Sequence, residues 1–218
     1  MISIDKSMGT VLSEQSPALV KNYGPGALSS VSMRGGSAYH TAVLWKGFSL
    51  ANPMNGVMDF NLLPTFLFED ISIQYGGATA IWGSGAVSGV IHLNDNNTFI
   101  NRNSLKVGSR YSNASGWANF IDGKFSIKNF SSSIKLFLTD EKNAYPFQQD
   151  DEMKKQVHAE SKGSGLIAEN TYSINTTTAI NFNFWYQYAN RNIAPVMTEA
   201  ISNAVQRDRN YRYNITFT

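Results

Sequence analysis

A glycine-rich segment near residue 85 is the first part of this sequence that could do chemistry. Gly83, Gly85 and Gly89 give the spacing G-x-G-x-x-x-G. A dinucleotide-binding turn instead has the spacing G-x-G-x-x-G and opens a helix whose N-terminus holds the pyrophosphate. Here Val90–Leu93 continues as a short apolar run typical of a strand, and the chain has no G-x-x-x-x-G-K-[ST] loop. These glycines therefore do not predict a nucleotide site.

Histidines and carboxylates are the residues that could hold a metal ion. His40, His92 and His158 show no ligand spacing, and the chain has no cysteine to supply a thiolate. We therefore predict a hydrogen-bonded structural role for His40. Acidic clusters at 140–141 and 150–152 could bind calcium in a loop, but lysines interleave with them, which favours a solvated charged loop. No cofactor is predicted, with calcium bound in extracellular loops as the alternative.

The residue patterns of hydrolytic enzymes and of nucleic-acid-binding proteins are also missing. The chain has neither a G-x-S-x-G turn nor an H-E-x-x-H helix, so no enzymatic activity is predicted. Its 18 basic and 16 acidic side chains leave a net charge of +2, which provides no clustered basic face for a nucleic acid. No apolar run reaches the length of a membrane helix, while membrane β-strands remain possible because their signal is only alternation.

Three sequence blocks in the first half occur in an informative order. They are GPGALSSVSMRGG at 24–36, AVLWKG at 42–47 and EDISIQYGGATAIWGSGAVSGVIHL at 69–93. Together they resemble the plug domain of TonB-dependent outer-membrane transporters. A plug must fold tightly inside a barrel lumen, so its corners need residues that tolerate positive φ and close backbone approach. The resemblance assigns this structural role to Gly35, Gly47, Gly76, Gly83, Gly85 and Gly89.

The same resemblance implies roles for polar residues of the first half. Arg34 corresponds to an arginine that pairs with barrel carboxylates as a latch between plug and wall. Lys46 stands where the family usually has an aspartate, so any ion pair made by that aspartate is absent or reversed. The segment 47–60 lies where the family has an apical plug loop that touches ligand. The ligand-binding candidates at the plug apex are Tyr39, His40, Asn52, Met54 and Asn55.

The elements that must position these residues divide the chain near residue 94. Residues 1–93 are predicted to form a small α+β plug domain, since short apolar runs alternate with glycine-rich turns. The predicted strands are Val31–Met33, Ala42–Trp45, Ile71–Tyr75 and Gly89–Leu93. Helical turns are predicted at Gly9–Gln15 and at Leu62–Phe68, the second interrupted at Pro64.

Residues 94–218 have a period of two. In Thr178–Asn190, Ile180, Phe182 and Phe184 fall on one face, and polar residues fall mainly on the other. Six antiparallel strands are predicted, at Ser104–Tyr111, Trp117–Lys128, around Ile134–Leu138, at Gly165–Tyr172, Thr178–Asn190 and Tyr211–Phe217. Tight turns at one end and longer, irregular connections at 140–156 and 190–207 are typical of an outer-membrane barrel. We therefore predict the first six strands of an incomplete transmembrane β-barrel.

The resemblance implies active uptake of a scarce, bulky ligand across the cell outer membrane. About six strands cannot enclose a plug, so we expect an internal piece of a larger transporter that lies in membrane lipid. The implied partner is a TonB-type energy-coupling protein, whose binding box is missing from this chain. The implied ligand is cobalamin or, as the next choice, a ferric siderophore. The alternatives are a SusC-like glycan-import channel working with a surface lipoprotein, and a soluble β-rich binding module, which would sequester Ile180, Phe182 and Phe184 in a closed core.

Overall fold

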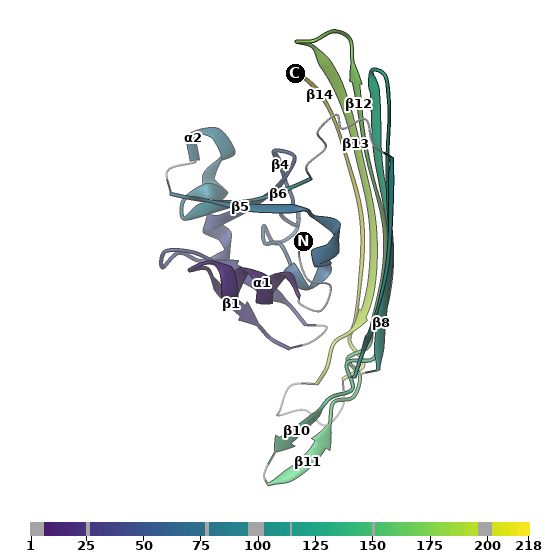
Figure 1. Ribbon diagram of the computed structural model, residues 1–218. Coiled ribbons are helices and arrows are strands. Elements are labelled where there is room, and N and C mark those ends of the chain that lie inside the picture. The colour runs from purple at the N-terminus through teal and green to yellow at the C-terminus, as the bar shows by residue number, and fades with distance from the viewer. Residues whose placement is uncertain are drawn as a thin grey trace. The chain divides into compact units, whose positions relative to one another are not determined.

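The computed structural model describes residues 7–24, 27–76, 79–95, 103–113, 115–149, 151–195 and 202–218. The chain divides into two compact units, Met1–Asn96 (unit 1) and Asn97–Thr218 (unit 2). Figure 1 labels their helices and strands. The predicted boundary after residue 93 falls at the end of the last strand of unit 1, β6 (Gly89–Asn94).

Unit 1 is an α+β arrangement of short elements. In chain order these are α1 (Met8–Gln15), β1 (Leu19–Asn22), β2 (Ser29–Ser32), η1 (Ala38–His40), β3 (Thr41–Trp45), β4 (Phe48–Ser49), η2 (Phe60–Leu62), η3 (Thr65–Leu67), β5 (Asp70–Tyr75), α2 (Thr79–Trp82), η4 (Ser84–Ala86) and β6. β1 and β2 form an antiparallel hairpin. A four-stranded sheet has the order β4-β3-β6-β5, with β3 and β6 parallel and the other pairs antiparallel.

Local sequence explains the helical elements of unit 1. Ser7 caps α1 because its Oγ accepts a hydrogen bond from the backbone N–H of Thr10 at 3.2 Å. Met8 and Leu12 of α1 are buried. The predicted interruption at Pro64 is confirmed, since two short 3₁₀ turns, η2 and η3, flank this proline. Proline has no N–H to continue a helical hydrogen-bond ladder, so the segment divides there.

An apolar core lies against the sheet of unit 1. Leu44 of β3, Val90 of β6 and Ala86 of η4 pack together, with Ala42 and Trp82 against them. Because β3 and β6 are central strands, residues on both of their faces are buried, and their sequences are nearly continuous apolar runs. This packed sheet gives the turns and loops of unit 1 a fixed base.

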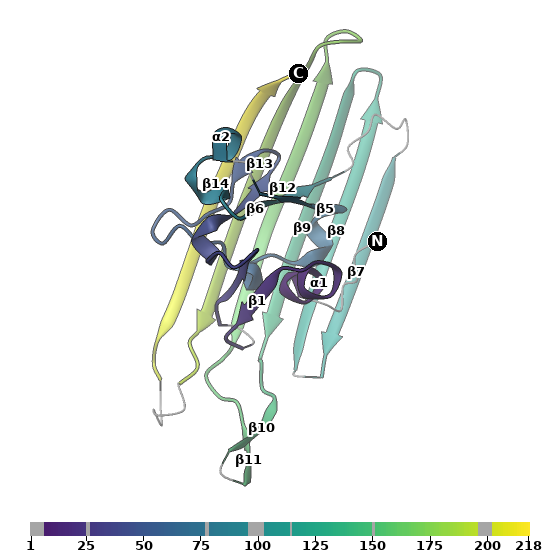
Figure 2. The same ribbon diagram turned by 90° about the vertical axis from the view of Figure 1, so that its left-hand side faces the viewer.

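Unit 2 contains a single six-stranded antiparallel sheet of long strands. The strands are β7 (Ser104–Ser112), β8 (Gly116–Ile127), β9 (Phe130–Glu141), β12 (Ser161–Ser173), β13 (Ala179–Asn192) and β14 (Val205–Phe217). Their order is β14-β13-β12-β9-β8-β7, so each strand pairs with the long strands before and after it in the chain. Figure 2 shows them side by side. In the described part of the chain, no helix has the length and apolar character needed to cross a membrane.

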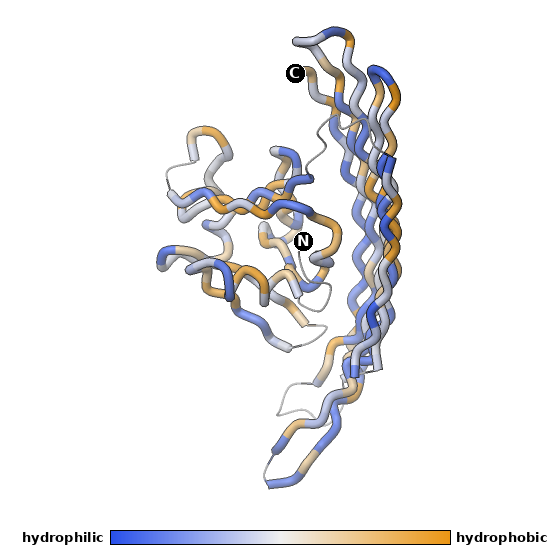
Figure 3. Tube along the Cα trace, viewed as in Figure 1, coloured by the Kyte–Doolittle hydropathy of each residue, from blue (hydrophilic) through white to orange (hydrophobic). Residues whose placement is uncertain are grey.

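The two faces of this sheet show an inverted pattern of burial. Leu136 and Leu138 of β9 are 45% and 55% exposed, whereas the neighbouring Lys135 is 2% exposed. Hydropathy alternates along each strand (Figure 3). We call the face that carries Leu136 the apolar face and the face that carries Lys135 the polar face. Phe182 is on the apolar face and is 45% exposed, so this residue does not lie in the closed core that a soluble β-rich module would require.

The connection between β9 and β12 is more ordered than the sequence predicted. It contains the antiparallel hairpin β10 (Pro146–Gln149) and β11 (Glu152–Lys155), which extends beyond one end of the sheet (Figure 2). The prediction of an irregular connection at 140–156 was therefore wrong in this part. A strand of four residues is too short for its alternation to stand out.

Candidate functional site

The turn after β2 positions the predicted latch residue. Arg34 and Gly35 both have positive φ, 52° and 73°, and the Gly36 N–H donates to the Met33 carbonyl at 2.9 Å. The Arg34 guanidinium lies against Gly76, because a Cβ at that glycine would come within 2.6 Å of Nη1. The Arg34 side chain is exposed. Its pairing with carboxylates of the wall stays a prediction.

The β3–β4 hairpin contains the departure from the family pattern. Lys46 and Gly47 have φ of 51° and 81°, and Trp45 pairs with Phe48 across this two-residue turn. Positive φ at both central residues is the geometry of a type I′ turn, which favours glycine at the second position. The Lys46 Nζ donates to the Asp95 carbonyl at 3.4 Å, so the lysine binds a backbone oxygen at the end of unit 1.

Tyr39 and His40 lie on the 3₁₀ turn η1. The Ser37 backbone N–H donates to Nδ1 of His40 at 3.3 Å, and the Ser37 Oγ lies 3.3 Å from the same nitrogen. The prediction of a hydrogen-bonded His40 is therefore confirmed. Tyr39 is 62% exposed, and the ring projects from a turn whose conformation His40 helps to fix.

The 51–57 loop is built by the side chains of its own asparagines. The Oδ1 of Asn52 accepts from the Met54 N–H at 2.8 Å, and the Oδ1 of Asn55 accepts from the Val57 N–H at 3.2 Å. The Gly56 N–H also donates to the Asn52 carbonyl at 2.7 Å. Asparagine side chains that bond two residues ahead imitate a backbone turn. Asn52 and Asn55 therefore shape the loop, and Met54 is left 95% exposed at its tip.

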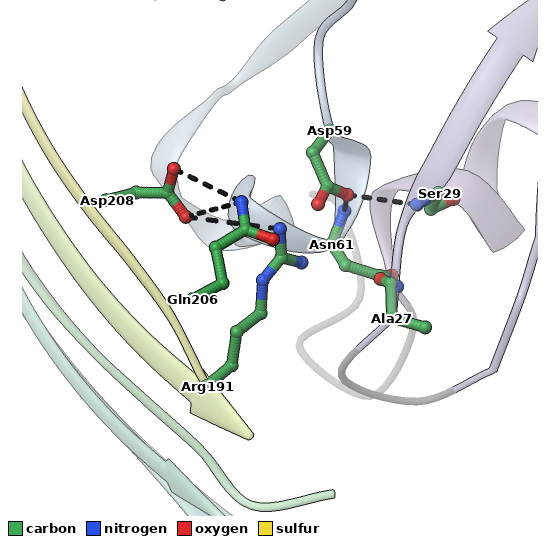
Figure 4. Close-up of polar contacts among 7 residues, drawn as sticks. All are labelled: Ala27, Ser29, Asp59, Asn61, Arg191, Gln206 and Asp208. Atoms are coloured by element: carbon green, nitrogen blue, oxygen red, sulfur yellow. Dashed lines mark hydrogen bonds and ion pairs between the residues drawn. The ribbon is translucent and has the colours of Figure 1, made fainter. Parts of the chain in front are cut away.

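Buried polar contacts anchor the chain just after this loop. Asp59 is 7% exposed, and its Oδ1 accepts from the backbone N–H groups of Ser29 and Asn61, both at 3.0 Å. The Asn61 Nδ2 in turn donates to the Ala27 carbonyl at 2.6 Å. Figure 4 shows these contacts. These contacts hold the end of the 51–57 loop against the β1–β2 hairpin. Neither Asp59 nor Asn61 was predicted from the sequence, although an Asp-x-Asn sequence suited to a helical N-cap was visible.

The structure brings the ligand-binding candidates from two segments close together. A Cβ at Gly56 would lie 3.7 Å from Cδ1 of Tyr39, so the tyrosine ring packs beside the 51–57 loop. An exposed ring, a thioether and amide groups thus share one surface of unit 1. Such a surface can bind a large, partly apolar molecule through contact area and hydrogen bonds. Whether these five residues contact ligand stays a prediction.

The structural glycines divide into two groups. Positive φ occurs at Gly35, Gly47, Gly76, Gly83 and Gly89. Gly89 is the most constrained, since a Cβ there would lie 2.7 Å from Cε of Met33 and 2.8 Å from the Gln74 carbonyl. Gly85 differs, because its φ is not in the left-handed region and the nearest atom to a Cβ would be 3.7 Å away. The conformational reason given for Gly85 was therefore wrong.

The polar face of unit 2 carries paired charges that sequence reasoning did not single out. Arg191, 3% exposed, lies 4.0 Å from Asp208, which also accepts hydrogen bonds from Gln206 (Figure 4). Lys106 and Asp122 are direct cross-strand partners 3.9 Å apart. The period of two places all of these residues on one face. Their pairing, however, depends on strand register, which the sequence does not state.

Two acidic side chains of the described chain, Asp140 and Glu141, pair with basic residues. Among the described residues, no group of three carboxylates, histidines or cysteines is close enough to hold a metal ion. Asp140 instead pairs with Lys162 at 3.3 Å, and Glu141 pairs with Arg110. Asp150 lies outside the described residues. Calcium in this connection remains an untested alternative.

Comparison with known sequences supports the resemblance. Residues 4–90 match the family model of the TonB-dependent Receptor Plug Domain. The vitamin B12 transporter BtuB of Vibrio vulnificus (strain YJ016) is 40% identical over 70 residues, which are 32% of this chain and 11% of that protein. BtuB of Vibrio cholerae (strain O395) is 33% identical over 75 residues, 34% of this chain and 12% of the relative. The matches thus span a small part of these relatives' length.

Solved structures share the fold across both units. The copper transporter OprC has a TM-score of 0.71 at 13% identity over 89% of this chain and 30% of its own. The ferric enterobactin receptor PfeA has a TM-score of 0.68 at 12% identity over 97% of this chain and 36% of its own. The siderophore receptor PirA from Acinetobacter baumannii has a TM-score of 0.65 at 13% identity, covering 86% and 30% of the two chains. At such identities the likeness concerns the fold alone.

A plug domain followed by a long-stranded sheet with an exposed apolar face defines a class of membrane receptor. Residues 4–90 thus match the plug domain of TonB-dependent receptors, and the chain shares the fold of the solved transporter and receptor structures. Within that class, the sequence relatives named above are vitamin B12 transporters. These relatives do not favour the glycan-import alternative.

Proposed function

We propose that this chain belongs to an outer-membrane receptor that takes up a scarce, bulky ligand with energy supplied by a TonB-type partner. The observation that carries the proposal is the plug-domain match at residues 4–90, and it is joined by a vitamin B12 transporter that is 40% identical to this chain over 70 residues. The sheet of unit 2 supports it, because an exposed apolar face with a buried polar face suits a wall between lipid and a wet lumen. We propose the cell outer membrane as its location on the same grounds.

Cobalamin is the proposed ligand, and a ferric siderophore is the second choice. The exposed surface formed by Tyr39 and the 51–57 loop supports a bulky ligand. It offers an aromatic ring, a thioether and backbone groups, and none of its side chains is charged. The test is equilibrium binding of cobalamin, and separately of ferric enterobactin, to the full-length receptor in detergent. We expect cobalamin to bind at or below micromolar concentration. Absence of cobalamin binding in that range would exclude cobalamin as the ligand. Binding of ferric enterobactin alone would make a ferric siderophore the preferred ligand.

Variants of the surface identify which groups contact ligand. Met54→Ala and Tyr39→Ala remove exposed side chains without touching a hydrogen bond of the 51–57 loop, so we expect each to weaken binding by about tenfold, or 1.4 kcal/mol. Ile81→Ala is the matched control, because Ile81 is also an exposed apolar side chain of unit 1, at 71%. Equal effects of all three variants would argue against this surface as the binding site.

The coupling partner is proposed from the family and is tested through transport. Cells that lack the energy-coupling protein should bind ligand at the surface but fail to accumulate it. Accumulation at an unchanged rate without that protein would contradict a TonB-dependent mechanism.

A further inference from the structure

The cations on the apolar face of unit 2 gather at one end of the sheet. Among the described strand positions on this face, the basic residues are Lys162, Arg207 and Arg209. Register places them together: Lys162 pairs with Asn190, Asn190 pairs with Arg207, and Arg209 lies two residues further along β14 on the same face. All three therefore lie toward the end of the sheet that carries the β10–β11 hairpin. Asp140 is the acidic residue of this group, so the cluster has a net charge of +2.

These cations are already held in place by their neighbours. The Lys162 Nζ lies 3.3 Å from Asp140, and the Lys162 side chain is 64% exposed. The Arg207 Nε donates to Oδ1 of Asn190 at 3.4 Å. The guanidinium of Arg209 lies 5.8 Å from the centre of the Tyr188 ring. Because these contacts order the side chains beforehand, binding of an anion would cost less conformational entropy.

Aromatic residues at the same level mark this end as a membrane interface. Trp117 of β8 pairs with Asp140, and Tyr111 of β7 pairs with Trp117, so both rings lie in the cross-strand row that contains Lys162 and Arg207. They are 39% and 77% exposed. Rings with a polar edge collect where the hydrocarbon meets lipid headgroups. The cation cluster is therefore at headgroup level, with the apolar rows of the sheet next to it.

A shallow hollow opens in the apolar rows beside the cluster. It has a volume of about 400 Å³ and is lined by Asn119, Ile121, Leu136, Leu138, Ser164 and Leu166. The hollow exists because the small side chain of Ser164 lies between the larger Leu138 of β9 and Leu166 of β12. Arg209 and Leu138 belong to the same cross-strand row, through Tyr188 and Ser164, so the hollow begins at the level of the cations.

We infer that this part of the sheet binds an anionic phospholipid. Arg207, Arg209 and Lys162 contact the headgroup phosphate, and one acyl chain lies in the hollow. Guanidinium groups form paired, charge-assisted hydrogen bonds with phosphate, and basic residues near a membrane surface attract anionic lipid. The inference rests on the proposed membrane location of unit 2. It adds a specific lipid class and a binding site to that proposal.

The test is native mass spectrometry of the full-length receptor with phosphatidylglycerol or phosphatidylcholine of identical chains. We expect the anionic lipid to bind roughly tenfold better, and the preference to fall as salt rises. Arg207→Gln with Arg209→Gln should abolish the preference, while Lys128→Gln, which removes a cation from the β8–β9 turn, should preserve it. Ser164→Leu fills the hollow and should weaken binding of both lipids without changing charge.

Each outcome bears on the inference. Equal binding of the two lipids by a receptor that inserts into vesicles would overturn the lipid site and leave the proposed function standing. Failure of the receptor to insert into vesicles at all would overturn the proposed function and the lipid site together. If the double variant does not fold, the test is the salt dependence of the wild-type preference for the anionic lipid. A preference that does not change with salt would overturn the role of the cations.

Discussion

The two units of this chain use the same residue types in opposite ways. In unit 1, Ile91 and Leu93 are fully buried and the charged groups lie mainly outside. In unit 2, Leu136 is 45% exposed while Lys135 and Glu169 are each 2% exposed. Alternation along a strand only separates two faces. The surroundings of a sheet decide which of those faces is buried.

Glycine also has a different purpose in each unit. Every described glycine with positive φ belongs to unit 1, where such residues make turns. In unit 2, Gly108 and Gly165 have ordinary φ and leave room for rings. A Cβ at Gly108 would lie 2.1 Å from the Phe120 ring, and one at Gly165 would lie 2.3 Å from the Phe137 ring. The four residues form one cross-strand row, so both rings lie over glycines on the polar face.

The largest effect is expected from a cavity in unit 1. Leu93→Ala removes a fully buried side chain, and we expect a loss of about 2–5 kcal/mol in the stability of that unit. Native-state hydrogen exchange of the β3 and β6 amides measures it. Ile81→Ala, at an exposed position, is the control and should have little effect. Equal losses of stability in Leu93→Ala and Ile81→Ala would contradict a buried apolar core in unit 1.

A charge on the apolar face of unit 2 tests the inverted burial. Leu136→Arg should destabilise the receptor in lipid vesicles by about 2–4 kcal/mol, because the arginine would lie in hydrocarbon. Asn119→Arg lies nearer the cation cluster and should cost about 0–1 kcal/mol. Denaturant titration from vesicles measures both. No difference between the two positions would refute a depth-dependent lipid face.

The pairing of rings with glycines should appear as coupling between two positions. Gly165→Ala forces a methyl group into the Phe137 ring, at an expected cost of about 1–3 kcal/mol. Adding Phe137→Leu should recover part of that loss, since the smaller side chain leaves space. Gly123→Ala is the control, because its nearest neighbours would be 3.9 Å away. Strict additivity in a double-mutant cycle would show that the ring does not fill this space.

The smallest effect concerns pH at the base of a long connection. The Asn192 Nδ2 donates to Oε2 of Glu160 at 2.8 Å, and this bond lowers the pKa of the Glu160 carboxyl below its usual 4.5. A lowered pKa stabilises the folded state above pH about 4.5, and this contribution is lost as pH falls through the folded pKa. The protection of the Asn192 backbone amide against hydrogen exchange, corrected for the pH dependence of intrinsic exchange, should therefore decrease as the pH falls below about 4.5. Glu160→Gln should remove the pH dependence, and a persisting dependence would point to another group.

Much of the candidate site follows from local rules. The interruption at Pro64, the hydrogen-bonded His40 and the Lys46–Gly47 turn each depend on residues a few positions apart, so their sequence was sufficient. Asn52 and Asn55 were predicted as ligand contacts, yet their side chains bond to the loop backbone. The structure forms a loop at 51–57, as an asparagine cluster favours, but no sequence pattern shows whether an amide faces its own backbone or the solvent.

The period of two, the six long strands and the glycine-rich plug were predictable from the sequence, because these signals depend on spacing along one segment. Only the tertiary structure decided that Arg34 lies against Gly76 and that Tyr39 packs beside Gly56. It also decided that Lys162, Arg207 and Arg209 gather at one end of the apolar face. Contacts of this kind join residues far apart in the chain. They depend on strand register and loop path, which are fixed by packing across the whole unit and not by any local pattern.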